Sequence, residues 1–120
     1  MIVVDSSAVL AYLLDEPGAD RVRSALSDGA VISTVNWSEV AQKVRRGDAW
    51  EPARALLLSY PLQIVPVAVD DAEAAAALRT AGSPLSLADR FCLALGARLQ
   101  LPVLSADHAW FDRPEVIPVR

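Results

Sequence analysis

The sequence has very few of the side chains that build disulfide frameworks and zinc sites. It contains one cysteine, Cys92, and one histidine, His108, among 120 residues. A single cysteine excludes an internal disulfide and fits a reducing compartment. One histidine and one distant cysteine argue against a zinc site. A metal bound by this chain would therefore take oxygen ligands, which hard divalent ions prefer.

The chain also lacks an excess of positive charge and any long apolar run. It has 15 acidic and 11 basic residues, for a net charge of −4, which argues against a passive nucleic-acid binder. It does not argue against a metal-dependent enzyme, because clustered carboxylates themselves make a protein acidic. No apolar run reaches the roughly 18 residues that span a bilayer, and the N-terminal MIVVDSSAVL lacks the basic region of a signal peptide. We expect a cytoplasmic protein with no membrane partner.

Short apolar runs alternate along the chain with segments of helical periodicity. The runs predict strands over residues 2–4, 30–33, 62–67, 102–105 and 116–119, the third at a sheet edge because it contains Pro66. The periodic segments predict helices over 6–15, 19–26, 35–46, 51–59, 70–81 and 87–99. This alternation predicts one α/β domain over residues 1–120, with a mostly parallel central sheet of four to five strands and helices on both faces.

Four acidic residues fall where predicted elements begin or end. Asp5 directly follows the first strand and Asp107 follows the fourth, while Glu39 and Asp89 lie near the starts of two helices. Binding sites of open parallel sheets lie beyond the carboxyl ends of their strands. The four carboxylates are therefore expected at one rim of the sheet.

Each acid also has a purely structural interpretation. Ser86 and Asp89 have the spacing of a capping box, as do Asn36 and Glu39 with Asn36 as the N-cap. Asp5 alone could cap the following helix, Asp107 could turn the chain, and Asp70 is the expected N-cap of the fifth helix. Sequence leaves these interpretations open beside a functional one.

Convergence of the four acids favours a cation site. Carboxylates close together repel one another, and partial burial strengthens the repulsion. Lys43 and Arg46 lie on the same helical face as Glu39 and could neutralise part of this charge. One or two Mg²⁺ or Mn²⁺ ions fit the oxygen ligands better.

The motifs together resemble the PIN-domain proteins, specifically the VapC-type toxins of bacterial toxin–antitoxin pairs. The resemblance rests on MIVVDSSAVLAYLLDEPGA at residues 1–19, NWSEVAQKV at 36–44 and SLADRFCLALGARLQLPVLSADHAW at 86–110. It implies a PIN-like domain with metal-dependent endoribonuclease activity. The catalytic acids it implies are Asp5, Glu39, Asp89 and Asp107, with Asp5, Asp89 and Asp107 as metal ligands; Ser6 or Ser7, Ser105 and the additional acid Asp112 would support them.

The resemblance also implies partners. These are an RNA substrate, a small cognate antitoxin whose tail blocks the site, and a second copy in a homodimer. The basic residues Lys43, Arg45 and Arg46 are the candidate phosphate contacts, although basic residues at a helix end also have a solvated, structural role. Two alternatives remain open: a catalytically silent PIN-fold module that binds RNA or protein, and a receiver-like phosphoacceptor domain.

Overall fold

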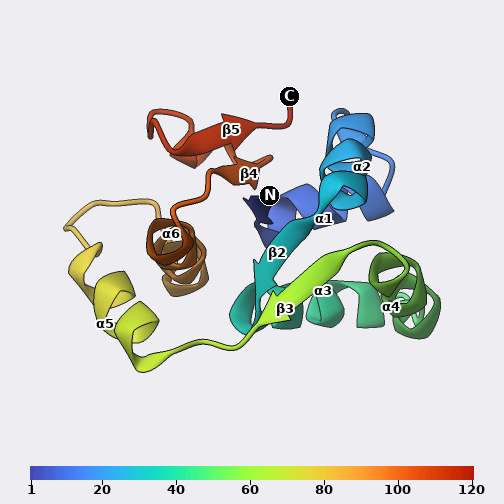
Figure 1. Ribbon diagram of the computed structural model, residues 1–120, viewed down its shortest axis with the longest axis horizontal. Coiled ribbons are helices and arrows are strands. Elements are labelled where there is room, and N and C mark those ends of the chain that lie inside the picture. The colour runs from blue at the N-terminus through green and yellow to red at the C-terminus, as the bar shows by residue number, and fades with distance from the viewer.

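A computed structural model describes residues 1–120, and its centre is a five-stranded parallel sheet (Figure 1). The strands are β1 (Ile2–Val4), β2 (Ala30–Ser33), β3 (Leu62–Val65), β4 (Val103–Ser105) and β5 (Val116–Pro118). Their order in the sheet is β3-β2-β1-β4-β5, and every neighbouring pair is parallel. The predicted α/β class and parallel sheet are confirmed, and β3 is an edge strand that ends just before Pro66.

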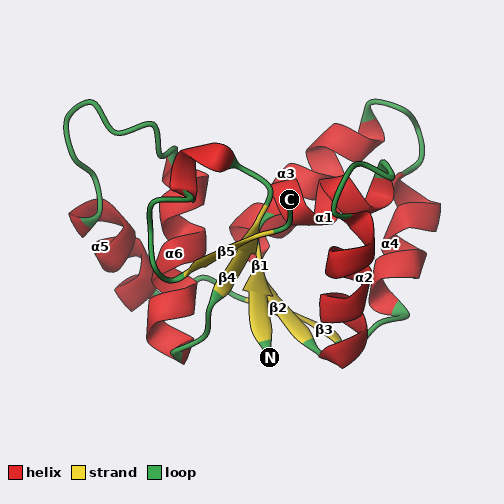
Figure 2. Cartoon of the chain, turned by 90° about the horizontal axis from the view of Figure 1, so that it is seen from above, coloured by secondary structure: helices red, strands yellow, loops and turns green.

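Six α-helices flank the sheet on both faces (Figure 2). They are α1 (Ser6–Leu13), α2 (Ala19–Asp28), α3 (Thr34–Arg45), α4 (Trp50–Leu58), α5 (Val69–Ala77) and α6 (Leu87–Leu99). Helices α1 to α4 lie on one side of the sheet, and α5 and α6 lie on the other. A short 3₁₀ helix (His108–Trp110) follows β4.

The alternation of side chains along the strands divides the core into two parts. Val4, Ile32 and Leu104 belong to the cluster that packs against α1, α2 and α4. Val3, Val31 and Val103 point to the other face, where they join buried residues of α6. Because successive strand residues point to opposite faces, continuous runs such as IVV and AVIS can serve both cores at once.

Two predicted helix caps are wrong. Asn36 is not an N-cap, because α3 begins at Thr34 and the Ser33 hydroxyl caps it by accepting from the Asn36 backbone N–H at 3.0 Å. Asp70 is not an N-cap either, because Ala68 occupies that position and the Asp71 carboxylate accepts its N–H at 3.0 Å. In both regions the helix begins earlier than the polar pattern indicated.

Helix α6 has the bounds that the sequence predicted and packs closely on the sheet. A Cβ atom at Gly96 would lie 2.8 Å from Cγ2 of Val103, so the absent side chain allows the close approach of α6 to β4. No helix of the chain is both long and apolar enough to cross a membrane.

Candidate active site

The sheet has a topological switch point between β1 and β4. Strand β1 pairs with β2 on one side and with β4 on the other, so the chain connections diverge there and leave a crevice at the strand ends. The register Val4↔Leu104 places Asp5 beside Ser105 at this point. Asp5 also caps α1, since its Oδ1 accepts the Ala8 N–H at 2.8 Å.

Two serines hold the Asp5 carboxylate from opposite chain segments. The Ser7 hydroxyl lies 2.7 and 2.8 Å from its two oxygens, and the Ser105 hydroxyl donates to Oδ2 at 2.7 Å. Both serine oxygens accept a backbone N–H, from Ala106 and Asp107 respectively. The two serine oxygens also lie 3.3 Å apart, so both hydroxyls and the Asp5 carboxylate form one hydrogen-bonded group that holds this carboxylate in place.

Asp5 is buried and has no cationic partner. Its side chain is 2% exposed, and burial raises its pKa from 3.8 to about 6 although three hydrogen bonds favour the charged form. A receiver-like phosphoacceptor would also need a second acid beside Asp5 and a lysine after the last strand, whereas serines follow Asp5 and the only lysine is Lys43.

Glu39 reaches the same region from the first turns of α3. Its Oε1 accepts from the Ser6 hydroxyl at 2.9 Å and from the Asn36 side-chain amide at 3.0 Å. Its Oε2 accepts no hydrogen bond from the protein. Neutral donors thus hold one oxygen of Glu39 and leave the other available.

Asp89 caps its own helix and is also part of this acidic group. The Ser86 hydroxyl accepts the Asp89 N–H at 3.1 Å, and Asp89 Oδ2 accepts the Ser86 N–H at 2.8 Å, which completes the predicted capping box. The pKa of Asp89 is raised mainly by burial, with a further contribution from the negative charges of Asp107 and Glu39. The structural and functional interpretations of Asp89 are therefore compatible.

Asp107, like Asp89, caps a helix and also contributes negative charge to the acidic group. It caps the 3₁₀ helix by accepting the Ala109 N–H on Oδ1 at 3.0 Å, and Oδ2 accepts no hydrogen bond. Its charge acts on Asp89, so it belongs to the same electrostatic cluster.

The negative charge of the four acids is not compensated by the protein. None of the four ion pairs in the structure involves Asp5, Glu39, Asp89 or Asp107. Their free oxygens, on Glu39, Asp89 and Asp107, are hard ligands of the kind that Mg²⁺ and Mn²⁺ bind. The donor set fits such an ion chemically, although no three acidic side chains, as they stand, surround one ion position.

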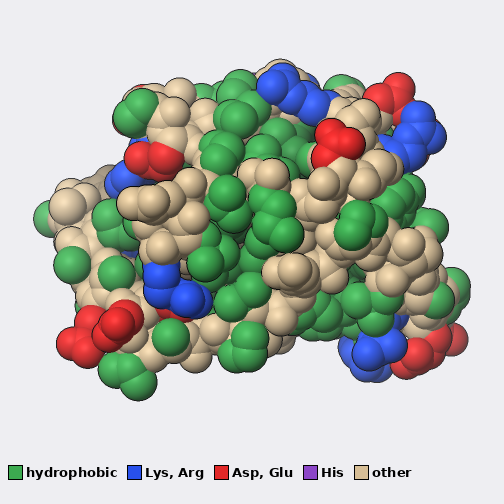
Figure 3. All heavy atoms as spheres, viewed as in Figure 1, with side chains coloured by type: hydrophobic (Ala, Val, Ile, Leu, Met, Phe, Trp, Pro, Cys, Tyr) green, Lys and Arg blue, Asp and Glu red, His purple; other side chains and the backbone are tan.

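The other predicted site residues lie elsewhere. Asp112 is exposed and lines a polar pocket with the 80–85 loop. Lys43 and Arg46 border an apolar groove between α1, α3 and α4. The Arg45 guanidinium lies 5.8 Å from the centre of the Trp50 ring, and Trp50 packs edge-on against Trp37. On the face shown in Figure 3, hydrophobic side chains occupy the middle and scattered charges lie around them, with no continuous basic surface.

Asn36 is the site residue whose part the sequence interpretation missed. It is 1% exposed and connects Glu39 to the backbone of α6 through its side-chain amide. Its position three residues before Glu39 was noticed only as a capping pattern, which concealed the contact to α6.

Solved structures of toxin–antitoxin proteins share this fold. A toxin–antitoxin complex from Klebsiella pneumoniae contains a chain with a TM-score of 0.84 and 21% identity, covering 100% of this chain and 98% of that one. VapC20 of Mycobacterium tuberculosis, a sarcin-ricin loop cleaving toxin, has a TM-score of 0.76 and 20% identity, covering 98% of this chain and 100% of that one. DNA-bound VapBC from Salmonella typhimurium has a TM-score of 0.74 and 15% identity, with full coverage of both chains.

Structures this distant in sequence show the shared fold alone. A family model assigns the chain to a protein family. No curated protein matches the sequence. The model of the PIN domain, however, matches residues 2–116, a span that includes the four acids and all five strands except the last two residues of β5. This chain belongs to the PIN domain family.

Proposed function

We propose that the chain is the toxin of a toxin–antitoxin pair and acts as an Mg²⁺- or Mn²⁺-dependent endoribonuclease. The observation that carries this proposal is the convergence of four acids at the switch point without any basic partner. A protein tolerates such repulsion where a cation relieves it. Family membership and the fold shared with VapC20, a sarcin-ricin loop cleaving toxin, support the same function.

The residues would divide the work of phosphodiester hydrolysis. Asp5, Asp89 and Asp107 would hold one or two cations, and Ser7 and Ser105 keep the Asp5 carboxylate in one orientation. When bound there, such a cation would supply positive charge to neutralise the scissile phosphate and to make an attacking water more acidic. The free Oε2 of Glu39 would bind the cation through a water molecule, or orient the attacking water and accept its proton.

The basic residues of α3 would contribute to substrate binding outside the acidic cluster. Lys43, Arg45 and Arg46 are exposed at the end of the helix that carries Glu39. Basic side chains in this position would contact RNA phosphates and guide the strand to an otherwise acidic site.

Cleavage assays test the nuclease proposal directly. Wild-type protein is incubated with RNA in Mg²⁺, in Mn²⁺ and in EDTA, beside Asp5→Asn and Asp89→Asn. Asp71→Asn is the matched control, because Asp71 is a buried aspartate outside the cluster. We expect cleavage by wild type and Asp71→Asn only with metal. Equal cleavage in EDTA, or equal cleavage by Asp5→Asn, would refute the nuclease; a wild type inactive on a broad range of RNAs would favour the silent binding module.

We also propose that the antitoxin binds an apolar groove formed partly by α1 and α3, the helices that begin at the site. The groove has a volume of about 580 Å³ and lies between α1, α3 and α4, with Lys43 and Arg46 at its rim. Leu14 and Leu56 line it and are 63% and 44% exposed. Together with the other apolar lining residues they form a contiguous exposed apolar surface, which is typical of protein interaction sites. An antitoxin segment with apolar side chains would cover them.

Substitutions in this groove separate antitoxin binding from catalysis. Leu14→Arg and Leu56→Arg place charge on exposed positions, so the fold should be retained. We expect co-purification with the antitoxin encoded beside the toxin to be lost while RNA cleavage persists. Unchanged binding by both variants would place the antitoxin elsewhere, and a change from dimer to monomer on gel filtration would assign the groove to a second copy.

A further inference from the structure

Asn36 is a buried amide whose polar atoms all have partners. Its Oδ1 accepts from the Ser33 hydroxyl at 2.6 Å, and its Nδ2 donates to Glu39 Oε1 at 3.0 Å and to the Ala88 carbonyl at 3.3 Å. Only 1% of the residue is exposed. With both amide hydrogens and the oxygen used, the side chain has a single orientation.

These hydrogen bonds join the elements that carry the acids. Ser33 is the last residue of β2, Glu39 belongs to α3, and Ala88 immediately precedes Asp89 in α6. Ser6, which follows Asp5, donates to the same oxygen of Glu39. Asn36 therefore lies at the centre of a network that fixes the spacing between the Glu39 and Asp89 backbones.

We propose that Asn36 is a positioning residue for catalysis, which holds Glu39 in place and sets its separation from Asp89. Glu39 and Asp89 are both carboxylates, and Asn36 bonds to Glu39 and to the residue that precedes Asp89, so like-charge repulsion acts across this link. Without these hydrogen bonds, the Glu39 side chain would turn away from the Asp89 carboxylate. A neutral amide restrains Glu39 without cancelling the charge that a cation requires, whereas a lysine or arginine would neutralise the site. This inference rests on the proposed nuclease function.

A merely structural Asn36 would affect folding stability alone. Two other positions on α3 provide controls for that outcome. Val40 is fully buried in the apolar core on the same helix, so Val40→Ala destabilises the protein without touching Glu39. Gln42 is exposed on α3, so Gln42→Ala controls for surface change.

The experiment measures kcat and KM for Mn²⁺-dependent RNA cleavage, calorimetric Mn²⁺ affinity and thermal unfolding of the full chain. We expect Asn36→Ala to lower kcat about 10- to 100-fold and to weaken Mn²⁺ binding about tenfold, as loss of supporting hydrogen bonds does at metal sites, with KM for RNA little changed. Val40→Ala should lower the unfolding temperature while kcat and Mn²⁺ affinity stay within about twofold. In a Glu39→Gln background, Asn36→Ala should lower kcat no further.

Asn36→Leu guards against a cavity or a buried charge as the cause of the loss. Leucine is neutral and close to asparagine in shape but removes both donations, so we expect a loss of kcat similar to that of Asn36→Ala. The inference is overturned if Asn36 variants retain kcat and Mn²⁺ affinity at the level of Val40→Ala, or if their effect adds fully to that of Glu39→Gln. If Asp89→Asn abolishes cleavage and Asn36→Ala does not, only this inference fails; if wild type neither binds Mn²⁺ nor cleaves RNA, the nuclease proposal fails with it.

Discussion

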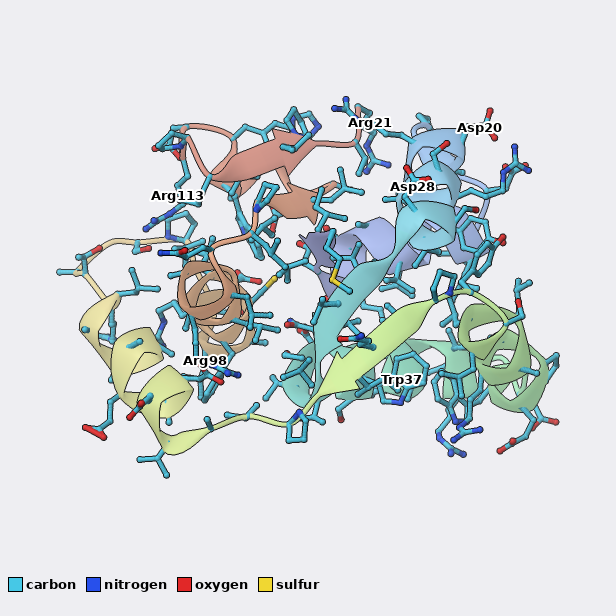
Figure 4. All side chains as sticks on the ribbon, in the orientation of Figure 1. Asp20, Arg21, Asp28, Trp37, Arg98 and Arg113 are labelled. Atoms are coloured by element: carbon cyan, nitrogen blue, oxygen red, sulfur yellow. The ribbon has the colours of Figure 1, made fainter.

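Two aspartates in this protein are buried to nearly the same degree but have opposite electrostatic environments. Asp5 is 2% exposed and Asp71 is 3% exposed. Arg98 donates two hydrogen bonds to Asp71, at 2.7 and 3.0 Å, and this contact lowers the pKa of Asp71. Figure 4 shows Arg98 on α6, the helix that packs against α5. Asp5 receives only neutral donors, and burial raises its pKa to about 6.

This difference separates a structural carboxylate from a functional one. The ion pair of Asp71 joins α5 to α6 and caps α5 through the Ala68 N–H, so its charge is used within the fold. The charge of Asp5 serves no ion pair, and three further acids surround the same rim. Uncompensated buried charge is costly, and proteins retain it mainly at functional sites.

The largest expected difference between the two aspartates concerns activity. Asp5→Asn removes a proposed cation ligand, so we expect RNA cleavage to fall by about a thousandfold, since metal assistance contributes several kcal/mol. Asp71→Asn should retain activity within a few fold. Initial cleavage rates in Mn²⁺ measure both, at a temperature where circular dichroism shows each variant folded. Comparable losses in the two variants would remove the functional distinction.

The next effect concerns stability. Asp71→Asn should destabilise the protein by about 1 kcal/mol, because it weakens two charge-assisted hydrogen bonds to Arg98, whose partly exposed guanidinium remains solvated. Since the pKa of Asp71 lies below its ordinary value of 3.8, this stabilisation is complete above pH 3.8 and disappears as the pH falls further. Urea unfolding at pH 7 and pH 3 measures the loss, and a loss that persists unchanged at the lower pH would contradict the ion pair as its cause.

Asp5→Asn should act in the opposite direction in metal-free protein. The folded state holds the Asp5 proton more tightly than the unfolded chain, so ionisation costs stability. This cost is absent below pH 3.8 and is complete once the pH exceeds about 6. The asparagine should therefore raise the free energy of unfolding in EDTA at pH 7.5 by about 1 kcal/mol, less than the pKa shift alone allows because asparagine has one acceptor oxygen fewer. A gain of equal size at pH 4 would contradict this origin.

Divalent metal should give the smallest effect. At a concentration twice its dissociation constant, Mn²⁺ should raise the free energy of unfolding of wild type by about 0.6 kcal/mol, seen as a higher unfolding temperature. Asp71→Asn should show the same increase, and Asp5→Asn and Asp89→Asn should show little. An equal increase in all four proteins would mean that the ion binds outside the acidic cluster.

The strands and α6 could be predicted because their patterns are local. Short apolar runs marked all five strands to within two residues, and Ser86 and Asp89 marked the start of α6, where the capping box is confirmed. The caps of α3 and α5 could not be predicted in the same way. Asn36 and Asp70 have good capping residue types, yet the β2–α3 connection is so tight that Ser33, still part of the strand, takes the cap.

The candidate site shows the same division. The four acids were recognisable because each follows or begins an element at the carboxyl side of the sheet. The roles of Asn36 and Arg98 were not, since each bonds to a segment far along the chain: Asn36 to Ala88, and Arg98 to Asp71. Asp71 also lies near the start of a helix, and residue type alone does not reveal which acid has a basic partner.

The sequence by itself determined the alternation of strands and helices, the parallel sheet and the placement of four carboxylates at element ends, because these depend on side-chain periodicity and short-range turns. Only the tertiary structure decided which buried acids are neutralised and which are left charged. Coulomb interactions depend on distances in space, and the strand order β3-β2-β1-β4-β5 sets those distances by bringing residues about a hundred positions apart, such as Asp5 and Ser105, into hydrogen-bond contact.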